Sequence, residues 1–262
     1  IYARGPISLT KPVAYVLNGG GKRLRPLLTI FAAEACGGTK SGVFSAALAV
    51  EVLHNFTLVH DDIMDQDSIR HGQETVHNKW DDGVAILTGD AMLSLALRLL
   101  NEAPAQPHLQ MKIFIDGLLA VCEGQALDKE FENDQSITED MYLNMIDKKT
   151  GSLLSASVAL PMIYNGESDD RIKIYEEFGR CLGRGFQIQD DILEAEGNTE
   201  QIGKPSGSDK NKDKATFPKI IGLDASKKRV LDLYNHSNDA INIFGDKGEG
   251  LKYLAKMIIQ RT

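Results

Sequence analysis

The sequence predicts a single all-α domain, and three observations support this prediction. Apolar residues recur at steps of three and four along nearly the whole chain, as the buried face of a helix requires. No segment alternates polar and apolar residues with the period of two that marks a half-buried strand, and no Asn-Gly turn joins two β-branched runs. With 262 residues, of which 42% are hydrophobic, the chain is long enough to bury a sizeable core.

The pattern predicts roughly ten helices in one domain over residues 1–262. It is clearest in segments 45–58, 84–100, 113–127, 153–163, 172–193 and 230–243. Breaks rich in glycine or proline separate these segments at 19–21, 37–38, 104–107, 165–166 and 197–208. The polar stretch 197–214 is too long for a simple connection, so we interpret it as a lid or binding loop, with an ordinary surface loop as the alternative.

Composition and charge exclude several classes of protein. The formal net charge of −8 leaves no overall basic surface to hold nucleic acid. The three cysteines lie far apart and outside any CxxC pattern, so the sequence indicates neither a disulfide framework nor a zinc site. No apolar run reaches the length of a membrane span, because Glu51 and His54 interrupt the longest one, at 43–59. We therefore expect a cytoplasmic protein without a membrane span and, since the chain does not begin with Met, a truncated N-terminus.

The first chemical signal is a group of aspartates at the end of a long apolar segment. Asp61 and Asp65 are four residues apart and so lie on the same helix face, with Asp62 about 100° round the helix. Like charges at this spacing destabilise a helix unless something offsets them, and divalent cations with oxygen ligands do so. A solvated acidic helix end is the alternative for one such cluster alone.

A second acidic cluster follows another apolar segment and weakens that alternative. Asp190 and Glu194 are again four apart, with Asp191 beside the first. Two facing clusters can hold about two or three Mg²⁺ ions together with a diphosphate, because Mg²⁺ sites combine carboxylates with substrate phosphates. Basic residues that suit diphosphate oxygens occur at Lys22, Arg23, Arg25, Arg70, Lys148, Lys149, Lys204, Lys210, Lys212 and Lys214.

These clusters stand within a longer series of motifs. The series is Gly-Gly-Lys-Arg-Leu-Arg-Pro at 20–26, Leu-Val-His-Asp-Asp-Ile-Met-Asp at 58–65, Arg-His-Gly at 70–72, Gly-Asp-Ala at 89–91, Lys-Thr-Gly at 149–151, Phe-Gln-Ile-Gln-Asp-Asp at 186–191, Gly-Lys-Pro at 203–205 and Lys-Ala-Thr at 214–216. In order and spacing the chain resembles the trans-isoprenyl diphosphate synthases of the polyprenyl synthetase family, across nearly its whole length. The resemblance implies an all-α fold around a central cavity, a homodimer, and Mg²⁺-dependent head-to-tail condensation of isopentenyl diphosphate with dimethylallyl, geranyl or farnesyl diphosphate.

The resemblance also implies roles for individual residues. Mg²⁺ would be bound by Asp61, Asp65 and Asp190, with Asp62, Asp191 and Glu194 in support. The allylic diphosphate would be held by Arg70, Lys149, Lys204 and Lys214, and isopentenyl diphosphate by Lys22, Arg25 and His54. Thr150 and Gln187 would face the reacting carbon.

Two positions depart from the family pattern. The second acidic motif ends in Glu194 rather than Asp, which keeps an oxygen ligand but moves it by one methylene. His71 stands where many relatives have a second Arg that contacts isopentenyl diphosphate, so we expect a weaker affinity for that substrate.

Residues below the first aspartate cluster bear on product length. Thr57 lies about 6 Å and Leu53 about 12 Å below Asp61 on the same helix face, where a growing tail would run. In the family, a bulky residue at the position of Phe56 is associated with short products. We therefore expect a product of fifteen to twenty carbons, with twenty favoured; the alternative is that Phe56 is only a core aromatic.

Other functions stay open at this point. Glu51-x-x-His54 and Glu74-x-x-His77 have the spacing that di-iron carboxylate helical proteins use. A non-catalytic subunit of a heteromeric prenyl synthase would share the fold, although such subunits typically lack intact aspartate motifs. A terpene cyclase would share the metal chemistry but would not need the Gly-Gly-Lys-Arg site.

Overall fold

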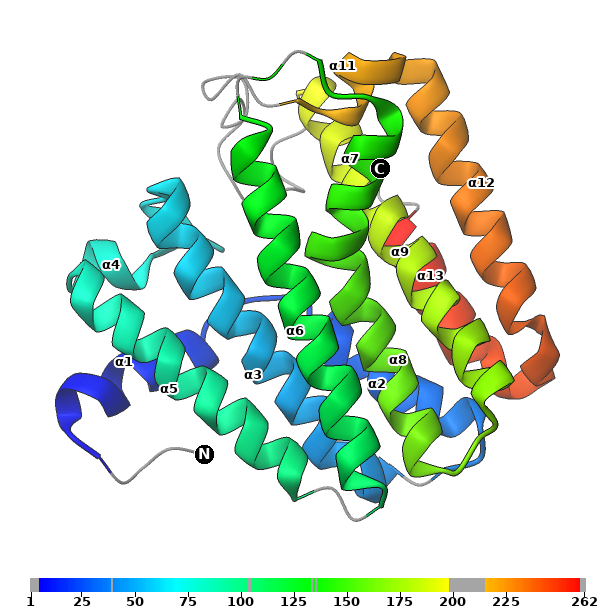
Figure 1. The fold of residues 1–262 in the computed structure, drawn as a ribbon, viewed down its shortest axis with the longest axis horizontal. Helices are drawn as coiled ribbons and strands as arrows, with labels where there is room; N and C mark the ends of the chain where they lie inside the picture. The colour runs from blue at the N-terminus through cyan, green and yellow to red at the C-terminus, as the bar shows by residue number, and fades with distance from the viewer. Residues whose placement is uncertain are drawn as a thin grey trace.

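The computed structural model describes residues 5–38, 40–102, 105–132, 134, 136–197 and 215–259, which are almost entirely helical (Figure 1). The α-helices are α1 (Ile7–Leu17), α2 (Leu24–Ala35), α3 (Lys40–Asp65), α4 (Val76–Lys79), α5 (Asp82–Asn101), α6 (Pro107–Glu130), α7 (Glu139–Ile146), α8 (Ser152–Tyr164), α9 (Asp169–Ala195), α11 (Phe217–Ile221), α12 (Leu223–Ile241) and α13 (Glu249–Ile259). A π-helical turn, η1 (Asp147–Gly151), and a 3₁₀ segment, η3 (Asn242–Gly248), complete the helical structure of the described residues. Ten of the α-helices have eight residues or more, so the all-α prediction is confirmed.

One short hairpin interrupts the helices. Strands β1 (Ile69–Arg70) and β2 (Gln73–Glu74) pair antiparallel across the two-residue turn His71-Gly72. Both turn residues have positive φ, 49° and 75°, as a type I′ hairpin turn requires. The sequence analysis missed this hairpin because two residues per strand are too few to show an alternating pattern.

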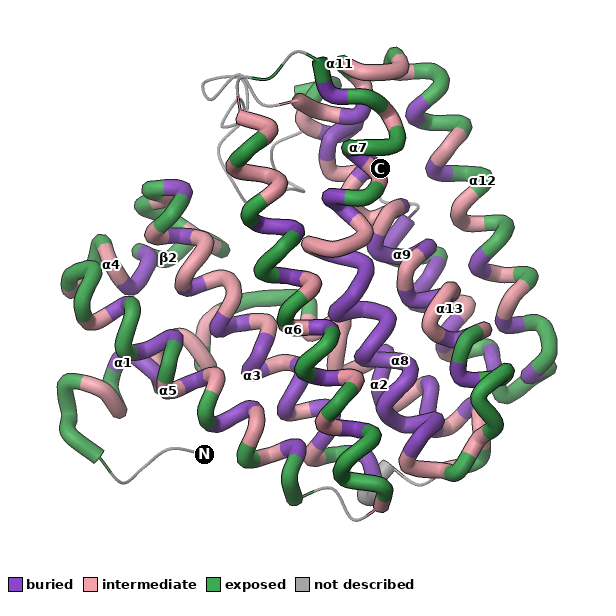
Figure 2. Tube along the Cα trace, viewed as in Figure 1, coloured by how far each residue is buried: buried purple, intermediate pink, exposed green. Residues whose placement is uncertain are grey.

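Helix α8 lies at the centre of the fold. Figure 2 shows it buried nearly along its whole length, and every residue from 152 to 163 is buried. On one side it contributes Leu153 and Leu160 to a hydrophobic cluster with α3 and α5. On the other side it contributes Leu154 and Val158 to a second cluster with α2, α9, α12 and α13. A helix that is apolar all round is expected in such a position.

The long helices bring the two acidic clusters to the same part of the molecule. Helices α3 and α9 have 26 and 27 residues, and both clusters lie at their C-terminal ends. In Figure 1 the C-terminal ends of α3, α6 and α9 all lie in the upper half of the view. The extent of the single domain over residues 1–262 stays a prediction.

Two helices of the described residues are unusually long and apolar. Val43–Asp65 in α3 and Asp82–Asn101 in α5 are long and apolar enough to cross a membrane by length and composition, with mean hydropathies of 1.4 and 1.6. A few polar residues, such as Glu51 and His54, do not lower the mean hydropathy of a long helix enough to exclude it by composition. Length and composition are weak evidence for a membrane span, because the core helix of a soluble protein can have both. In α3, 56% of the apolar window is buried within the protein.

Candidate active site

Most of the residues singled out in the sequence line one cavity of about 310 Å³. They are Arg25, His54, Thr57, Asp61, Asp65, Arg70, His71, Lys149, Thr150, Gln187, Asp190, Asp191 and Glu194. The fold thus brings acidic groups from the ends of α3 and α9 to the same cavity as basic groups from α2, β1 and η1.

Three predicted substrate-binding residues are not found in the described wall of this cavity. Lys204 and Lys214 fall outside the described residues, as does the binding loop predicted at 197–214 from residue 198 onward. Lys22 is exposed on the segment before α2 and does not line the cavity. Its neighbour Arg23 donates hydrogen bonds to the Gly19 carbonyl at 2.6 Å and to Glu51, so it anchors the glycine-rich segment to α3.

The sequence analysis missed several residues of the cavity. Asp128 lies near the end of α6, and its Oδ2 accepts a hydrogen bond from Lys149 Nζ at 2.5 Å. A signal for it existed, because this acid directly follows the apolar segment 113–127. The other lining residues are Leu58, Val121, Tyr142, Met145, Leu153, Phe186, Ala215 and Thr216. Most of these are apolar, and a sequence pattern does not distinguish an apolar cavity wall from a core.

Asp61 and Asp65 both line the cavity, as their four-residue spacing predicted. Burial raises the pKa of Asp61; the carboxylates of Asp65 and Asp128 raise it further, and the Lys149 ammonium lowers it. On the other side, Lys129 Nζ lies 3.7 Å from Asp65 Oδ1. The surroundings of Asp61 therefore disfavour its ionised form, and a bound cation would favour that form.

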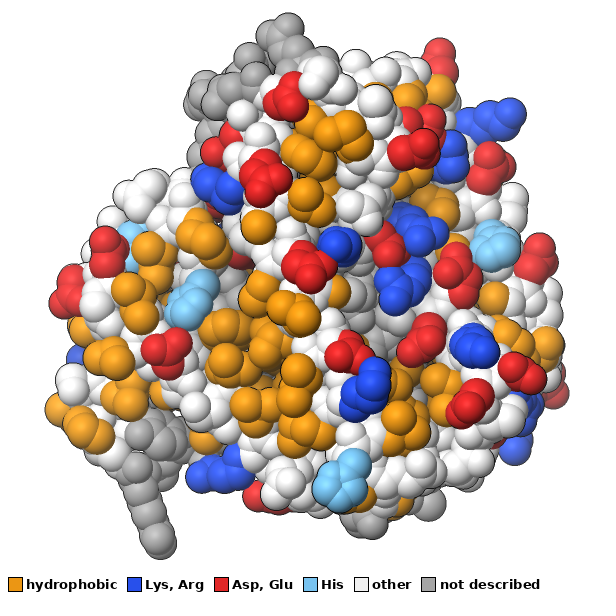
Figure 3. All heavy atoms as spheres, in the orientation of Figure 1, with side chains coloured by type: hydrophobic (Ala, Val, Ile, Leu, Met, Phe, Trp, Pro, Cys, Tyr) orange, Lys and Arg blue, Asp and Glu red, His pale blue; other side chains and the backbone are white. Residues whose placement is uncertain are grey.

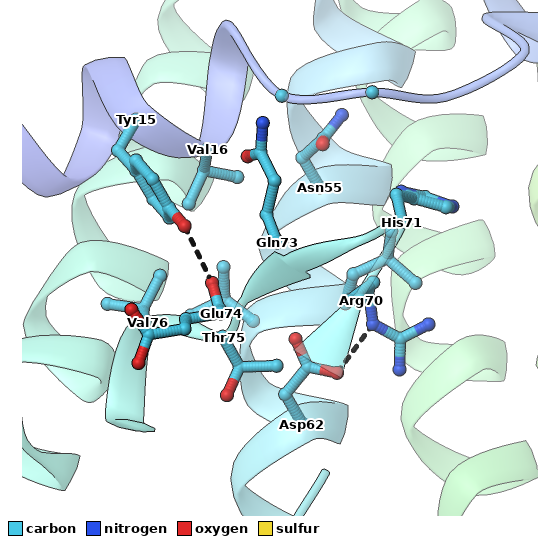
Figure 4. Close-up of a pocket in the computed structure, with 14 residues that line it drawn as sticks. Tyr15, Val16, Asn55, Asp62, Arg70, His71, Gln73, Glu74, Thr75 and Val76 are labelled. Carbon is cyan, nitrogen blue, oxygen red and sulfur yellow. Dashed lines mark hydrogen bonds and ion pairs between the residues drawn. The ribbon is translucent and has the colours of Figure 1, made fainter. Parts of the chain in front are cut away.

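Asp62 turns toward the β1–β2 hairpin and does not line the cavity (Figure 4). It is 4% exposed, and its Oδ1 accepts a hydrogen bond from Arg70 Nε at 2.5 Å. Tyr15 on α1 donates to the Glu74 carbonyl at 2.9 Å, which fixes the other strand of the hairpin. These contacts orient the Arg70 guanidinium, which lines both the cavity and a smaller hollow of about 50 Å³ behind it.

Asp191 is also 4% exposed, and protein donors surround its carboxylate. Its Oδ2 accepts from the Phe217 backbone N–H at 2.8 Å and from the Tyr142 hydroxyl, while Gln187 Nε2 donates to Oδ1 at 3.4 Å. Asp191 therefore connects α9 to α7 and to the start of α11. Its neighbour Asp190 and, one turn later, Glu194 also line the cavity.

Lys149 and Thr150 lie on the π-helical turn η1. Such turns are rare and frequently occur at functional sites. The first residue of the turn, Asp147, accepts a hydrogen bond from Arg180 Nη1 of α9 at 2.7 Å. A Cβ atom added to Gly124 would lie 2.2 Å from the Lys149 backbone nitrogen, so only glycine permits α6 to approach the turn this closely.

Arg25 and His54 form the part of the cavity wall contributed by α2 and the middle of α3. Burial lowers the pKa of Arg25 to about 10, against the opposing effect of Glu51, so the guanidinium stays charged at neutral pH. Burial, together with Arg25 and Arg70, lowers the pKa of His54 well below its ordinary value. The imidazole is therefore neutral at neutral pH and offers one N–H donor.

The residues of the di-iron alternative do not come together. Glu51 binds Arg23, and Glu74 Oε2 lies 3.6 Å from Lys79 Nζ. Within the described part of the chain, Glu51, His54, Glu74 and His77 form no group of clustered ligand atoms.

The donor atoms of the cavity suit a hard divalent cation. Its carboxylates come from Asp61, Asp65, Asp128, Asp190, Asp191 and Glu194, and no thiol lines the described part of its wall. Mg²⁺ prefers oxygen ligands and is usually held by a few carboxylates together with substrate phosphates. The residues present therefore fit Mg²⁺ bound with a diphosphate.

Comparison with known proteins assigns the family. The family model described as polyprenyl synthetase matches residues 7–244. Geranylgeranyl diphosphate synthase of Methanosarcina mazei is 42% identical over 233 residues, which are 87% of this chain and 71% of that protein. The geranylgeranyl diphosphate synthase of Saccharolobus solfataricus is 45% identical over 225 residues, 83% of this chain and 68% of the relative.

Solved structures agree with this assignment. A crystal structure of geranylgeranyl pyrophosphate synthase has a TM-score of 0.80 at 37% identity and covers 99% of this chain and 84% of its own. The geranylgeranyl pyrophosphate synthetase of Pyrococcus horikoshii has a TM-score of 0.90 at 30% identity, with 99% and 92% covered. The prediction of short-chain trans-prenyl diphosphate synthesis is confirmed, and neither the di-iron protein nor the non-catalytic subunit is favoured. The chain belongs to the polyprenyl synthetase family and is a prenyltransferase.

Proposed function

We propose that the protein condenses isopentenyl diphosphate head to tail with an allylic diphosphate in a Mg²⁺-dependent reaction that adds five carbons. This proposal rests on the cavity wall, which is acidic at one end and apolar deeper along the same helices. Asp128 lies at the acidic part of the wall, and the apolar Val121 lies on the same helix about 10 Å deeper. A charged headgroup and an apolar tail would each find a matching surface.

The acidic part of the wall would bind the allylic diphosphate. Asp61, Asp65 and Asp190 would hold Mg²⁺, with Glu194 as a further ligand and Asp62 and Asp191 in support through the contacts described above. Arg70 and Lys149, with Lys204 and Lys214 outside the described residues, would bind the diphosphate oxygens. Mg²⁺, when bound, supplies positive charge that stabilises the departing diphosphate.

The bond changes follow from this arrangement. The allylic carbon–oxygen bond breaks, and its electron pair leaves with the diphosphate, whose charge Lys149 and Arg70 stabilise. The double bond of isopentenyl diphosphate attacks the resulting allylic cation, and a proton then passes to the released diphosphate. Thr150 and Gln187 line the cavity where their oxygens can face the cation. Because water would quench the cation, the apolar wall also protects the reaction.

Isopentenyl diphosphate would bind at Lys22, Arg25, His54 and His71. Three of these line the cavity, and the charged Arg25 beside the neutral His54 provides donors for a diphosphate. The hypothesis of weak affinity at His71 predicts that His71→Arg lowers the KM for isopentenyl diphosphate. An unchanged or higher KM would count against the hypothesis.

We expect a product of fifteen to twenty carbons, with twenty favoured. Thr57 lines the cavity, whereas Phe56 and Leu53 are buried behind it in the cluster with α5. Phe56 stacks edge-on against His60, with ring centroids 4.8 Å apart. Sizing the products of Phe56→Ala and Thr57→Phe tests both positions: Thr57→Phe should shorten the product, and an unchanged length in Phe56→Ala would reduce Phe56 to a core aromatic.

We also expect a homodimer, and an exposed apolar face supports it. Figure 3 shows hydrophobic side chains gathered over α5 and α6. Ile86 and Leu87 on α5 are 47% and 60% exposed, and Ile115 and Leu119 on α6 are 47% and 58% exposed. Such a patch is typical of a subunit interface. Sedimentation of the wild type and of Leu119→Glu should give a dimer and a weakened dimer. The expected cytoplasmic location stays a prediction.

A product assay tests the proposed reaction. Purified protein receives labelled isopentenyl diphosphate with dimethylallyl, geranyl or farnesyl diphosphate, with and without Mg²⁺, and the dephosphorylated products are sized. Mg²⁺-dependent elongation that stops at fifteen or twenty carbons is the expected result. No elongation with any primer by the folded protein would contradict the proposal.

A further inference from the structure

A group of metal-binding side chains lies away from the cavity, between α9 and α12. Glu177 and Cys181 are one turn apart on α9, and His236 lies on α12. One ligand atom from each of the three lies within 4.8 Å of the other two. None of these residues lines the cavity. The group is thus separate from the acidic clusters.

We propose that Glu177, Cys181 and His236 form a binding site for a borderline-soft divalent cation of the zinc class, which connects α9 to α12. The ligand types support this class, because zinc is bound by Cys sulfur, His nitrogen and carboxylate oxygen. Three protein ligands leave the fourth tetrahedral position to water. Mg²⁺, by contrast, prefers oxygen ligands, so the two sites select different metals.

The geometry of the two α9 ligands fits a shared metal. Cys181 Sγ lies 3.3 Å from Glu177 Oε1. Sulfur and oxygen ligands of a tetrahedral zinc lie about 3.5 Å apart, given bond lengths of about 2.3 and 2.0 Å. The two side chains are therefore already near the required separation, and a ring nitrogen of His236 lies within 4.8 Å of both ligand atoms.

Access and local charge are also compatible with binding. Cys181 is 1% exposed, but the group opens to solvent at the exposed His236. A cationic side chain, Arg184, lies beside the group, with its Nη1 3.6 Å from Glu177 Oε1. Its other terminal nitrogen lies closer to Asp147 Oδ1, at 2.8 Å, which partly neutralises its charge.

The spacing of the cysteines along the chain does not indicate this group, because a single Cys meets a carboxylate one turn away and an imidazole from another helix. Cys181 precedes Asp190 on the same helix by about 14 Å, so a bound ion would restrain the segment that leads to the second acidic cluster.

Cobalt titration tests the proposal. Co²⁺ is added to metal-free protein in excess Mg²⁺, and the thiolate-to-cobalt charge-transfer band and the strong visible bands of four-coordinate cobalt are recorded. We expect one equivalent to bind, and Zn²⁺ to displace it. Cys181→Ser should abolish the charge-transfer band, and His236→Asn should weaken binding about 10- to 100-fold.

Matched controls use a cysteine and a histidine outside the site. Cys122→Ser and His108→Asn should bind Co²⁺ as the wild type does. Absence of the band in the wild type, its persistence in Cys181→Ser or its loss in Cys122→Ser would overturn the proposal. If Cys181→Ser does not fold, the wild-type titration and the exposed His236→Asn variant still decide the question.

Discussion

The C-terminal ends of α3 and α9 each hold a buried aspartate, but the hydrogen-bond donors to the two aspartates differ. In each, the first aspartate of an Asp-Asp pair lines the cavity, and the second is 4% exposed and accepts hydrogen bonds from other elements of the protein. Asp191 also lines the cavity, whereas Asp62 does not. Asp62 accepts from a charged donor, Arg70 on the hairpin. Asp191 accepts from neutral donors, the Tyr142 hydroxyl and the Phe217 backbone N–H.

We infer that adjacent aspartates have separate tasks. In the proposed reaction, the first carboxylate of each pair would bind the metal, and its neighbour would orient the elements that surround the substrate. In the α3 pair the oriented element carries a cation, Arg70, so Asp62 would affect diphosphate binding directly. In the α9 pair the oriented elements are α7 and α11, so Asp191 would affect substrate binding through the shape of the cavity.

The largest expected effect comes from the cavity-facing aspartates. Asp61→Asn and Asp190→Asn each remove a negative ligand and should lower kcat/KM by about 10²- to 10³-fold. Steady-state kinetics at saturating Mg²⁺ measures this. Asp116→Asn, on the exposed surface of α6, is a matched control that should retain full activity. Near-normal activity in either cavity variant would contradict the account.

Asp191→Asn should cause a smaller loss, because it disturbs orientation rather than removing a ligand. We expect kcat to fall about 10- to 100-fold. Tyr142→Phe removes only one of the donors and should cost about 1 kcal/mol of unfolding free energy with a modest change in kcat. A larger loss of kcat in Tyr142→Phe than in Asp191→Asn would contradict the assignment of Asp191 as the connecting group.

Without metal, Asp61→Asn should increase stability at neutral pH. Burial raises the pKa of Asp61 in the folded protein, so ionised Asp61 destabilises the fold at any pH above that value. Below about pH 4 the carboxyl is protonated in both folded and unfolded states, and the difference should vanish. Thermal unfolding in EDTA at several pH values measures this; an equal gain at acidic pH would point to another cause.

The smallest expected effect concerns His54. Its pKa is lowered in the folded protein, so below about pH 6.5 the unfolded state takes up a proton that the folded state does not. Stability must therefore fall as the pH falls from that value toward the folded pKa. His54→Asn should make the fall shallower in urea unfolding experiments.

Much of the fold could be predicted from the sequence, because apolar periodicity reports helices directly. The apolar pattern at 172–193 lies within α9, and that at 84–100 lies within α5. The hairpin at Ile69–Glu74 was missed because its strands are too short for any period to appear. Isolated polar residues interrupt the apolar run of α3, but the mean hydropathy of the whole segment stays high.

The candidate site was predictable where charged residues repeat at helical spacing. Asp61 and Asp65 meet this condition, and both line the cavity. Asp128 gave a weaker signal, a single acid after an apolar segment. The direction of Asp62 and Asp191 could not be predicted, because it depends on donors from β1, α7 and α11 that only the tertiary fold supplies.

The Mg²⁺ requirement of Asp190→Asn and Asp191→Asn tests the division of tasks most directly. The elongation rate of each variant is measured as a function of Mg²⁺ concentration. We predict that Asp190→Asn needs at least about tenfold more Mg²⁺ for half-maximal rate, because the proposed metal ligand is lost. Asp191→Asn should show a reduced maximal rate with a midpoint close to the wild type. Equal shifts of the midpoint in both variants would show that the two aspartates act together on the metal and would contradict the account.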